Sequence, residues 1–135
     1  MEIRETNLED YESIKNLLES ENMIGKWFTK EKLSKMLKKD KKSYFVAEIE
    51  DKTRGSIFSN DDGGYYGYIS KLIVDKNHRN NGVAHRLIKA VMDNFKARNI
   101  EWVFAHVKKD NIPSINLFKK FGIKIRETHY LIDNG

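Results

Sequence analysis

The sequence predicts a single α/β domain built on a mixed β-sheet of about six strands, with four helices distributed over both faces. The main observation is the order of apolar patterns, which reads strand, helix, helix, strand, strand, strand, helix, strand, helix, strand. Strands that follow one another early and alternate with helices late give a sheet with antiparallel and parallel neighbours. The second observation is that 135 residues show no internal repeat and no linker, so one domain over residues 1–135 accounts for the chain.

The N-terminal third predicts a short strand followed by two helices. Ile3 and Arg4 indicate the strand, and a helix is expected to begin near Asn7 because apolar residues then recur at helical spacing. The residues of this stripe are Leu8, Tyr11, Ile14, Leu17 and Leu18. Thr29 is a capping residue type ahead of a second, shorter helix with its own apolar stripe.

The middle of the chain predicts three strands. The runs 44–50 and 54–58 are rich in β-forming residues and are separated by residues 51–53, which predicts a hairpin. Residues 60–64 have the composition of a turn. The run 65–74 then predicts a longer strand, because it is rich in aromatic and β-branched residues.

The C-terminal part predicts two helices, each followed by a strand. The strongest helical stripe in the chain runs from Val83 to Phe95, and residues 102–107 form the next strand pattern. A short helix over residues 112–121 has proline near its start and Gly122 after its end, as helix termini favour. A last strand is expected from Ile123 to about Tyr130.

Composition excludes several classes of protein. Twenty-five basic against twenty acidic residues give a net charge of +5, which favours polyanionic partners, including nucleic acid and phosphorylated cofactors. The absence of cysteine excludes disulfides, thiolate metal sites and a cysteine acyl intermediate. No apolar run approaches the ~18 residues that a membrane span needs. The first residues lack the pattern of a secretion signal, so the cytoplasm is the expected compartment and no membrane partner is expected.

The most informative segment is the turn between the strand 65–74 and the following helix. It reads Arg-Asn-Asn-Gly-Val-Ala over residues 79–84. A turn of this kind directs successive backbone N–H groups at one point beside the positive end of a helix, which is the geometry of a diphosphate-binding site. Gly82 lets the backbone approach a ligand, and Ala84 lets the helix pack closely. An ordinary strand-to-helix turn is the alternative interpretation.

Two motifs resemble the GNAT N-acetyltransferase superfamily. Arg-x-x-Gly-x-Ala over residues 79–84 is similar to the family's acyl-coenzyme A signature. The segment Asn-Ile-Pro-Ser-Ile-Asn-Leu-Phe-Lys-Lys-Phe-Gly over residues 111–122 is similar to a second family motif, in the correct order. The resemblance extends from residue 1 to about residue 130. It implies a GNAT-like fold, acetyl-coenzyme A as cosubstrate, and direct transfer of acetyl to a primary amine on a small molecule, a protein N-terminus or a lysine.

The resemblance also implies which residues bind the cofactor. The backbones of Leu72 and Val74, on either side of Ile73, would pair with the pantetheine amides as a further strand would. Asn111 would hydrogen-bond the cofactor arm, although a helix N-cap is the alternative role. The diphosphate would be held by the residues of the turn, which are Arg79, Asn80, Asn81, Gly82, Val83, Ala84 and His85.

The catalytic groups that the family commonly uses are missing. The resemblance places Ser70 where a glutamate base is common and Phe118 where a tyrosine acid is common. Tyr68 and His106 are similar to a tyrosine and a histidine that hold a catalytic water in one group of protein N-terminal acetyltransferases. A histidine with a pKa near ~6.5 can accept the proton that an ammonium acceptor must lose. Core packing for Tyr68 and a backbone-bonded strand position for His106 are the alternatives, and no metal site is expected.

The C-terminal end departs from the family. Only thirteen residues follow Gly122, whereas the family pattern has two further strands joined by a hairpin. The sheet is therefore expected to lack its last strand. An open sheet edge invites pairing, so a homodimer through the C-terminal strand is predicted.

Two other functions remain open at this point. A non-catalytic acyl-coenzyme A-binding module is favoured by Ser70 and Phe118. A nucleic-acid-binding protein, the less favoured alternative, would depend on the net charge, the lysines of residues 35–42 and the tyrosines of residues 65–68.

Overall fold

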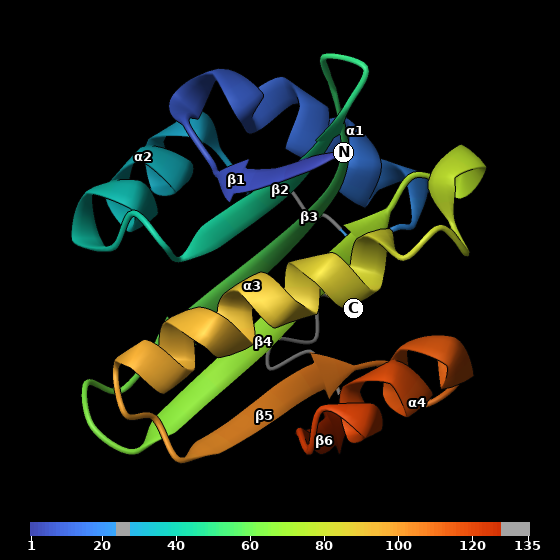
Figure 1. The fold of residues 1–135 in the computed structure, drawn as a ribbon. Coiled ribbons are helices and arrows are strands. Elements are labelled where there is room, and N and C mark those ends of the chain that lie inside the picture. Colours follow the sequence, from blue (N-terminus) through green and yellow to red (C-terminus); the bar gives the residue numbers. More distant parts are fainter. Residues whose placement is uncertain (24–27, 128–135) are drawn as a thin grey trace, which may run out of the picture.

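The computed structural model describes residues 1–23 and 28–127. Six strands form one mixed sheet in the order of the chain, from β1 to β6 (Figure 1). Neighbours from β1 to β4 are antiparallel, while β4 with β5 and β5 with β6 are parallel. The strands are β1 (Glu2–Glu5), β2 (Tyr44–Ile49), β3 (Lys52–Asp61), β4 (Tyr66–Val74), β5 (Trp102–Val107) and β6 (Lys124–Glu127). The predicted mixed six-stranded sheet is confirmed.

Four α-helices cover the two faces of the sheet. Helices α3 and α4 share one hydrophobic cluster on one face, with α3 lying along the strands in Figure 1. Helices α1 and α2 share a second cluster on the opposite face, against β2, β3 and β4. The helices are α1 (Tyr11–Ser20), α2 (Lys30–Lys39), α3 (Val83–Ala97) and α4 (Ile112–Lys120), with short 3₁₀ turns at η1 (Leu8–Asp10) and η2 (Lys76–His78).

The helix starts follow their capping residues. Asn7 accepts a hydrogen bond from the N–H of Glu9 and begins η1, which continues into α1. Thr29 accepts from the N–H of Lys32 and caps α2. Both are positions where a polar side chain satisfies an otherwise unpaired backbone donor.

The hairpin between β2 and β3 is tighter than the sequence predicts. Its turn is at Glu50 and Asp51, which both have positive φ (54° and 64°), so β3 already begins at Lys52. A two-residue turn of this hand matches the twist of the strands that it joins. At its other end, β3 runs through Asn60 to Asp61, so the expected turn over residues 60–64 starts two residues later.

That later turn is fixed by one carboxylate. Asp62 accepts hydrogen bonds from the backbone N–H groups of Gly64, Tyr65 and Tyr66 at 2.9–3.0 Å. The bonds lower the pKa of Asp62, because they stabilise its charged form.

In the expected last strand, residues 124–127 are confirmed as β6, whereas residues 128–130 lie outside the described part of the chain.

Helix α3 approaches β4 so closely that one strand position must be glycine. A Cβ placed on Gly67 would lie 2.6 Å from the ring of Phe95, which is 1% exposed. The ring therefore occupies the space that a side chain on β4 would need. This contact fixes the distance between the C-terminal half of α3 and the sheet.

We expect Gly67→Ala to lower the free energy of unfolding by about 1–3 kcal/mol, because Phe95 must leave its position to admit the methyl group. Chemical denaturation measures the change. Gly64→Ala is the matched control, because a Cβ there would meet only an oxygen of Asp62 at 3.9 Å. Equal stability of the two variants would contradict the close approach of α3 and β4.

Candidate active site

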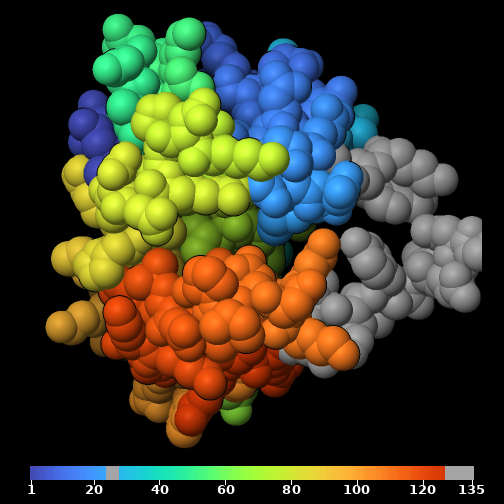
Figure 2. Space-filling model, turned by 90° about the vertical axis from the view of Figure 1, so that its right-hand side faces the viewer, coloured from blue at the N-terminus to red at the C-terminus, as the bar shows by residue number. Residues whose placement is uncertain are grey.

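The sheet opens between β4 and β5. Their pairing runs from Tyr66 opposite Trp102 to Ile69 opposite Ala105, and then stops. Strand β4 continues to Val74 and keeps its partner β3 on the other side. Among residues 1–23 and 28–127, no strand pairs with the β5-facing edge of residues 70–74. In Figure 2 the green atoms of the sheet lie recessed between the yellow-green segment before α3 and the orange segment of α4.

The backbone of this open edge can bind an extended ligand, although the carbonyl oxygen of Val74 already accepts a hydrogen bond from Arg79 Nε at 3.1 Å. The N–H of Asp75 donates to the carbonyl of Arg54 on β3, at 2.7 Å. Because successive residues of a strand direct their backbone groups to opposite sides, Val74 and Leu72 direct theirs toward the open edge. The side chains of Ile73 and Val74 are buried in the two clusters, so these positions could serve a ligand through their backbone alone.

The turn after β4 presents uncapped backbone donors. Asn80 and Gly82 both have positive φ, at 66° and 78°, and Gly82 is the N-cap of α3 without a side-chain hydrogen bond. The first turn of α3 contains no acidic residue, and a Cβ on Gly82 would meet nothing within 4 Å. The side chain of Val83 is buried in the core, and that of Ala84 packs against it. The turn therefore combines the positive end of a helix with open space in front of it.

Two side chains of the turn are engaged elsewhere in this structure. The Arg79 Nε donates to the carbonyl oxygen of Val74 at 3.1 Å, and its guanidinium also pairs with Glu21 after α1. The ring of His85 packs against Phe121, with ring centroids 4.9 Å apart. Sequence analysis assigned both side chains to the phosphates. That role stays a prediction, and for Arg79 it requires the guanidinium to leave Glu21.

Asn111 has the role that was given as the alternative. Its side-chain oxygen accepts a hydrogen bond from the N–H of Ser114 at 3.3 Å and caps α4. The residue is exposed and lies in the connection between β5 and α4. Contact with a cofactor arm stays a prediction.

The structure brings Tyr68 and His106 together. Their ring centroids are 6.2 Å apart, and Tyr68 also stacks on Phe104 at 6.0 Å. Gly67 and Ile69 face α3, so Tyr68 between them faces the opposite side of the sheet, which is the side of α1 and α2. Burial, and then the charge of Arg126, lower the pKa of His106 below its usual value. The imidazole is therefore mostly neutral at pH 7 and able to accept a proton.

Ser70 and Phe118 have different environments. Ser70 is half-buried on β4, opposite Phe58 of β3, at the point where the sheet opens. Phe118 is 2% exposed and belongs to the core under α3 and α4. Phe118 therefore contributes packing, and neither residue supplies a titratable group.

Sequence analysis missed Lys71 and Arg126. Lys71 has a positive φ of 53° at an irregularity in the pairing of β3 with β4, and its Nζ lies 5.5 Å from the ring centroid of Phe58. Burial lowers its pKa. The guanidinium of Arg126 lies 4.2 Å from the ring centroid of Phe104. The signal for Lys71 was a charged residue inside an apolar strand, whereas Arg126 had none.

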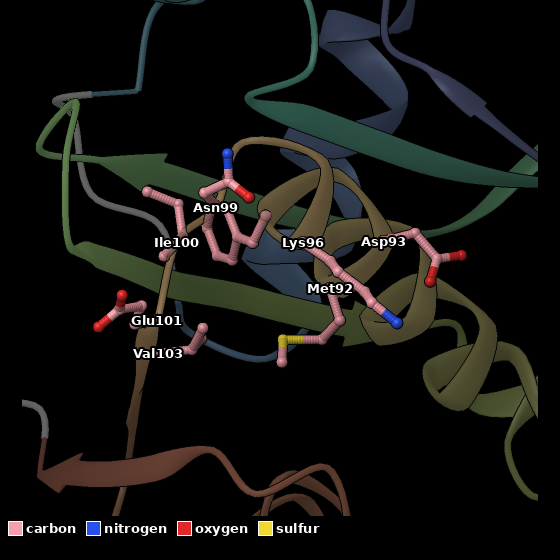
Figure 3. A pocket seen from close by; sticks show the side chains of 8 residues that line it. Met92, Asp93, Lys96, Asn99, Ile100, Glu101 and Val103 are labelled. Atoms are coloured by element: carbon pink, nitrogen blue, oxygen red, sulfur yellow. The ribbon is translucent and has the colours of Figure 1, made fainter.

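A cavity lies away from these residues. It has a volume of about 460 Å³ and is formed by the end of α3 and the start of β5, with Met92, Lys96 and Val103 among its lining residues (Figure 3). It contains none of the candidate site residues. Within the described ranges there is also no group of three or more residues that could hold a metal, and no helix long and apolar enough to span a membrane.

A mixed sheet that opens between two parallel strands, beside an uncapped helix after the first of them, defines a candidate site for a nucleotide-linked acyl donor. The chain belongs to the acetyltransferase (GNAT) family, which matches residues 2–123. The resemblance that the two sequence motifs indicated is therefore confirmed.

Two curated relatives show what the chain resembles. The N-alpha-acetyltransferase of Sulfurisphaera tokodaii is 30% identical over 111 residues, which cover 72% of this chain and 66% of that protein. The chloroplastic GCN5-related N-acetyltransferase 6 of Arabidopsis thaliana is 36% identical over 63 residues, covering 47% of this chain and 22% of that protein. The chain thus spans less than two thirds of the length of either relative.

Solved structures share the fold. Ard1 from Thermoplasma volcanium superposes with a TM-score of 0.78 at 23% identity, over 90% of this chain and 80% of that one. An aminoglycoside acetyltransferase from an uncultured soil metagenomic sample, in complex with sisomicin, has a TM-score of 0.76 at 21% identity, over 99% and 96%. These likenesses support the fold that the sequence predicted.

Proposed function

We propose that this chain is an N-acetyltransferase that transfers acetyl from acetyl-coenzyme A directly to a primary amine. The observation that carries the proposal is the open edge of β4 leading into the uncapped N-terminus of α3. An extended amide-bearing arm fits such an edge, and a diphosphate fits the helix terminus. Family membership supports the same donor.

The residues divide into two groups by position. Leu72 and Val74 offer backbone groups to the arm, and the turn 79–85 offers N–H groups to the diphosphate. Tyr68 and His106 lie on the opposite side of the opening, where an amine can enter. There His106, directly or through a water shared with the Tyr68 hydroxyl, takes the proton that the acceptor must lose before it attacks.

The relatives suggest the kind of acceptor without fixing it. One relative is named an N-alpha-acetyltransferase, and one solved structure with the same fold is named an aminoglycoside acetyltransferase. We therefore propose a primary amine of a small molecule, a protein N-terminus or a lysine.

Release of free thiol tests the function. Purified protein mixed with acetyl-coenzyme A and a panel of amines and peptides should release coenzyme A only when an acceptor is present. A non-catalytic acyl-coenzyme A-binding module is the second candidate, because Ser70 and Phe118 offer no proton-transfer group. Calorimetric binding of acetyl-coenzyme A without thiol release on a broad panel would favour the module.

We expect Gly82→Asp to abolish binding of coenzyme A, because a carboxylate in front of α3 repels the diphosphate. Isothermal calorimetry measures the affinity. Gly63→Asp is the matched control, since Gly63 also has a positive φ of 83° and open space around it, but lies in the distant turn before β4. An affinity that both variants retain would rule out the turn as the diphosphate site.

The pH dependence of the rate tests His106. The base acts when neutral, so kcat/KM should fall as the pH drops through its pKa, which burial and Arg126 hold below about 6.5. Arg126→Gln removes a positive neighbour, so the pKa of His106 rises, and on acidification activity should be lost at a higher pH than in the unmodified protein.

His106→Ala should lower kcat by roughly 10²-fold or more with unchanged affinity for coenzyme A. If kcat and its pH profile do not respond to either substitution, His106 is structural.

We also propose a homodimer through the C-terminal strand. Strand β6 pairs with β5 on one side, and no strand in the described part of the chain pairs with its other edge. Unpaired edges favour association. Small-angle scattering over a concentration series should show a dimer, and a monomer at all concentrations would contradict it.

The cytoplasm stays the proposed compartment.

A further inference from the structure

Two cations close to the opening have no ion-pair partner in the part of the chain that the structure describes. Lys71 and Arg126 both lie beside aromatic rings of the sheet, Lys71 near Phe58 on β3 and Arg126 near Phe104 on β5. Phe104 in turn stacks with Tyr68, which neighbours His106. Lys71 therefore lies on β4 three residues after Tyr68, and Arg126 lies on β6 opposite His106 in the strand register.

Lys71 is the more informative of the two. Among residues 1–23 and 28–127, its ammonium has no carboxylate partner and no hydrogen bond, and its residue is only partly exposed. A charge removed from water is costly unless an opposite charge or hydrogen bonds compensate it. The lowered pKa of Lys71 has this same cause, which is burial without an anion. A carboxylate at this position would compensate the charge.

Several acidic residues of the N-terminal half have partners of their own. Asp61 pairs with Arg98 at 2.7 Å, and Glu19 lies 3.9 Å from Lys15. Asp62 accepts the three backbone donors of its turn. Glu21 pairs with Arg79 and is released if Arg79 turns to the diphosphate. The observation that favours an anionic group on the acceptor is therefore Lys71, for which residues 1–23 and 28–127 hold no carboxylate partner.

We propose that the acceptor is an amine that carries a carboxylate within a few bonds, and that Lys71 binds this carboxylate while the amine faces Tyr68 and His106. Arg126 adds to the positive potential. The inference rests on the proposed function and narrows its substrate class. A free amino acid and a peptide with an acidic residue next to its N-terminus share this chemistry, whereas polyamines and aminoglycosides lack it.

Pairs of acceptors that differ in one carboxylate test the preference for an anionic acceptor. They also separate a free amino acid from a peptide with an acidic residue next to its N-terminus. Thiol release is measured with leucine against leucinamide, and with Met-Glu amide against Met-Gln amide. A higher kcat/KM, by about tenfold, for the carboxylate member of one pair supports the proposal and identifies the source. Equal rates within both pairs, with thiol release intact, overturn it and leave the acetyltransferase function standing. No thiol release from any acceptor overturns both.

Variants at Lys71 locate the effect. Lys71→Met keeps an unbranched side chain at the same backbone conformation but removes the charge, so KM for the preferred acceptor should rise about tenfold with kcat little changed. Lys71→Arg should keep the preference. Lys89→Met is the control, because Lys89 is exposed on α3 and paired with Asp93. A preference that survives Lys71→Met overturns the assignment, and the affinity for coenzyme A shows that each variant is folded.

Discussion

The loss of pairing between β4 and β5 after Ile69 and Ala105 is the constraint on which the rest of the site depends. Up to that point β4 is an interior strand, with both edges satisfied. Beyond it, β4 keeps β3 and has one edge unpaired, so backbone groups that a sheet normally consumes become available to a ligand. The irregularity at Lys71 lies within this stretch and changes which side chains face α1 and which face α3.

Most of the fold could be predicted because local signals and burial agree. The boundaries of β5 and the start of α3 follow directly from apolar periodicity. Asn7 marks the start of η1, which leads into α1 at Tyr11, and Thr29 marks the start of α2. The hairpin turn was placed too late because Glu50 is not a residue type that usually adopts positive φ, and no glycine or asparagine marks the turn. Asn60 and Asp61 have turn composition, yet pairing with β4 extends β3 over them.

The candidate site was predictable in position but not in side-chain detail. The turn 79–85 follows β4, and Tyr68 and His106 lie on neighbouring strands with adjacent rings, whereas the roles assigned to them stay predictions. Arg79 pairs with the residue after α1, and His85 packs against the residue after α4, and no local pattern reveals such contacts. A charged residue inside an apolar strand marks Lys71 as unusual, but only the structure shows that its ammonium lies beside the ring of Phe58.

The packing of α3 sets a length scale for the donor. Phe95 fixes the far end of this helix against Gly67, and Val83 and Leu87 are buried near its beginning. The helix is thus held along its length and cannot slide along β4. The distance between its N-terminus and the rings of Tyr68 and His106 is then fixed by the fold, and it sets the length that the donor must span. A donor whose arm is too short to reach from one to the other could occupy either end of the site but would leave its acyl group out of reach of the amine.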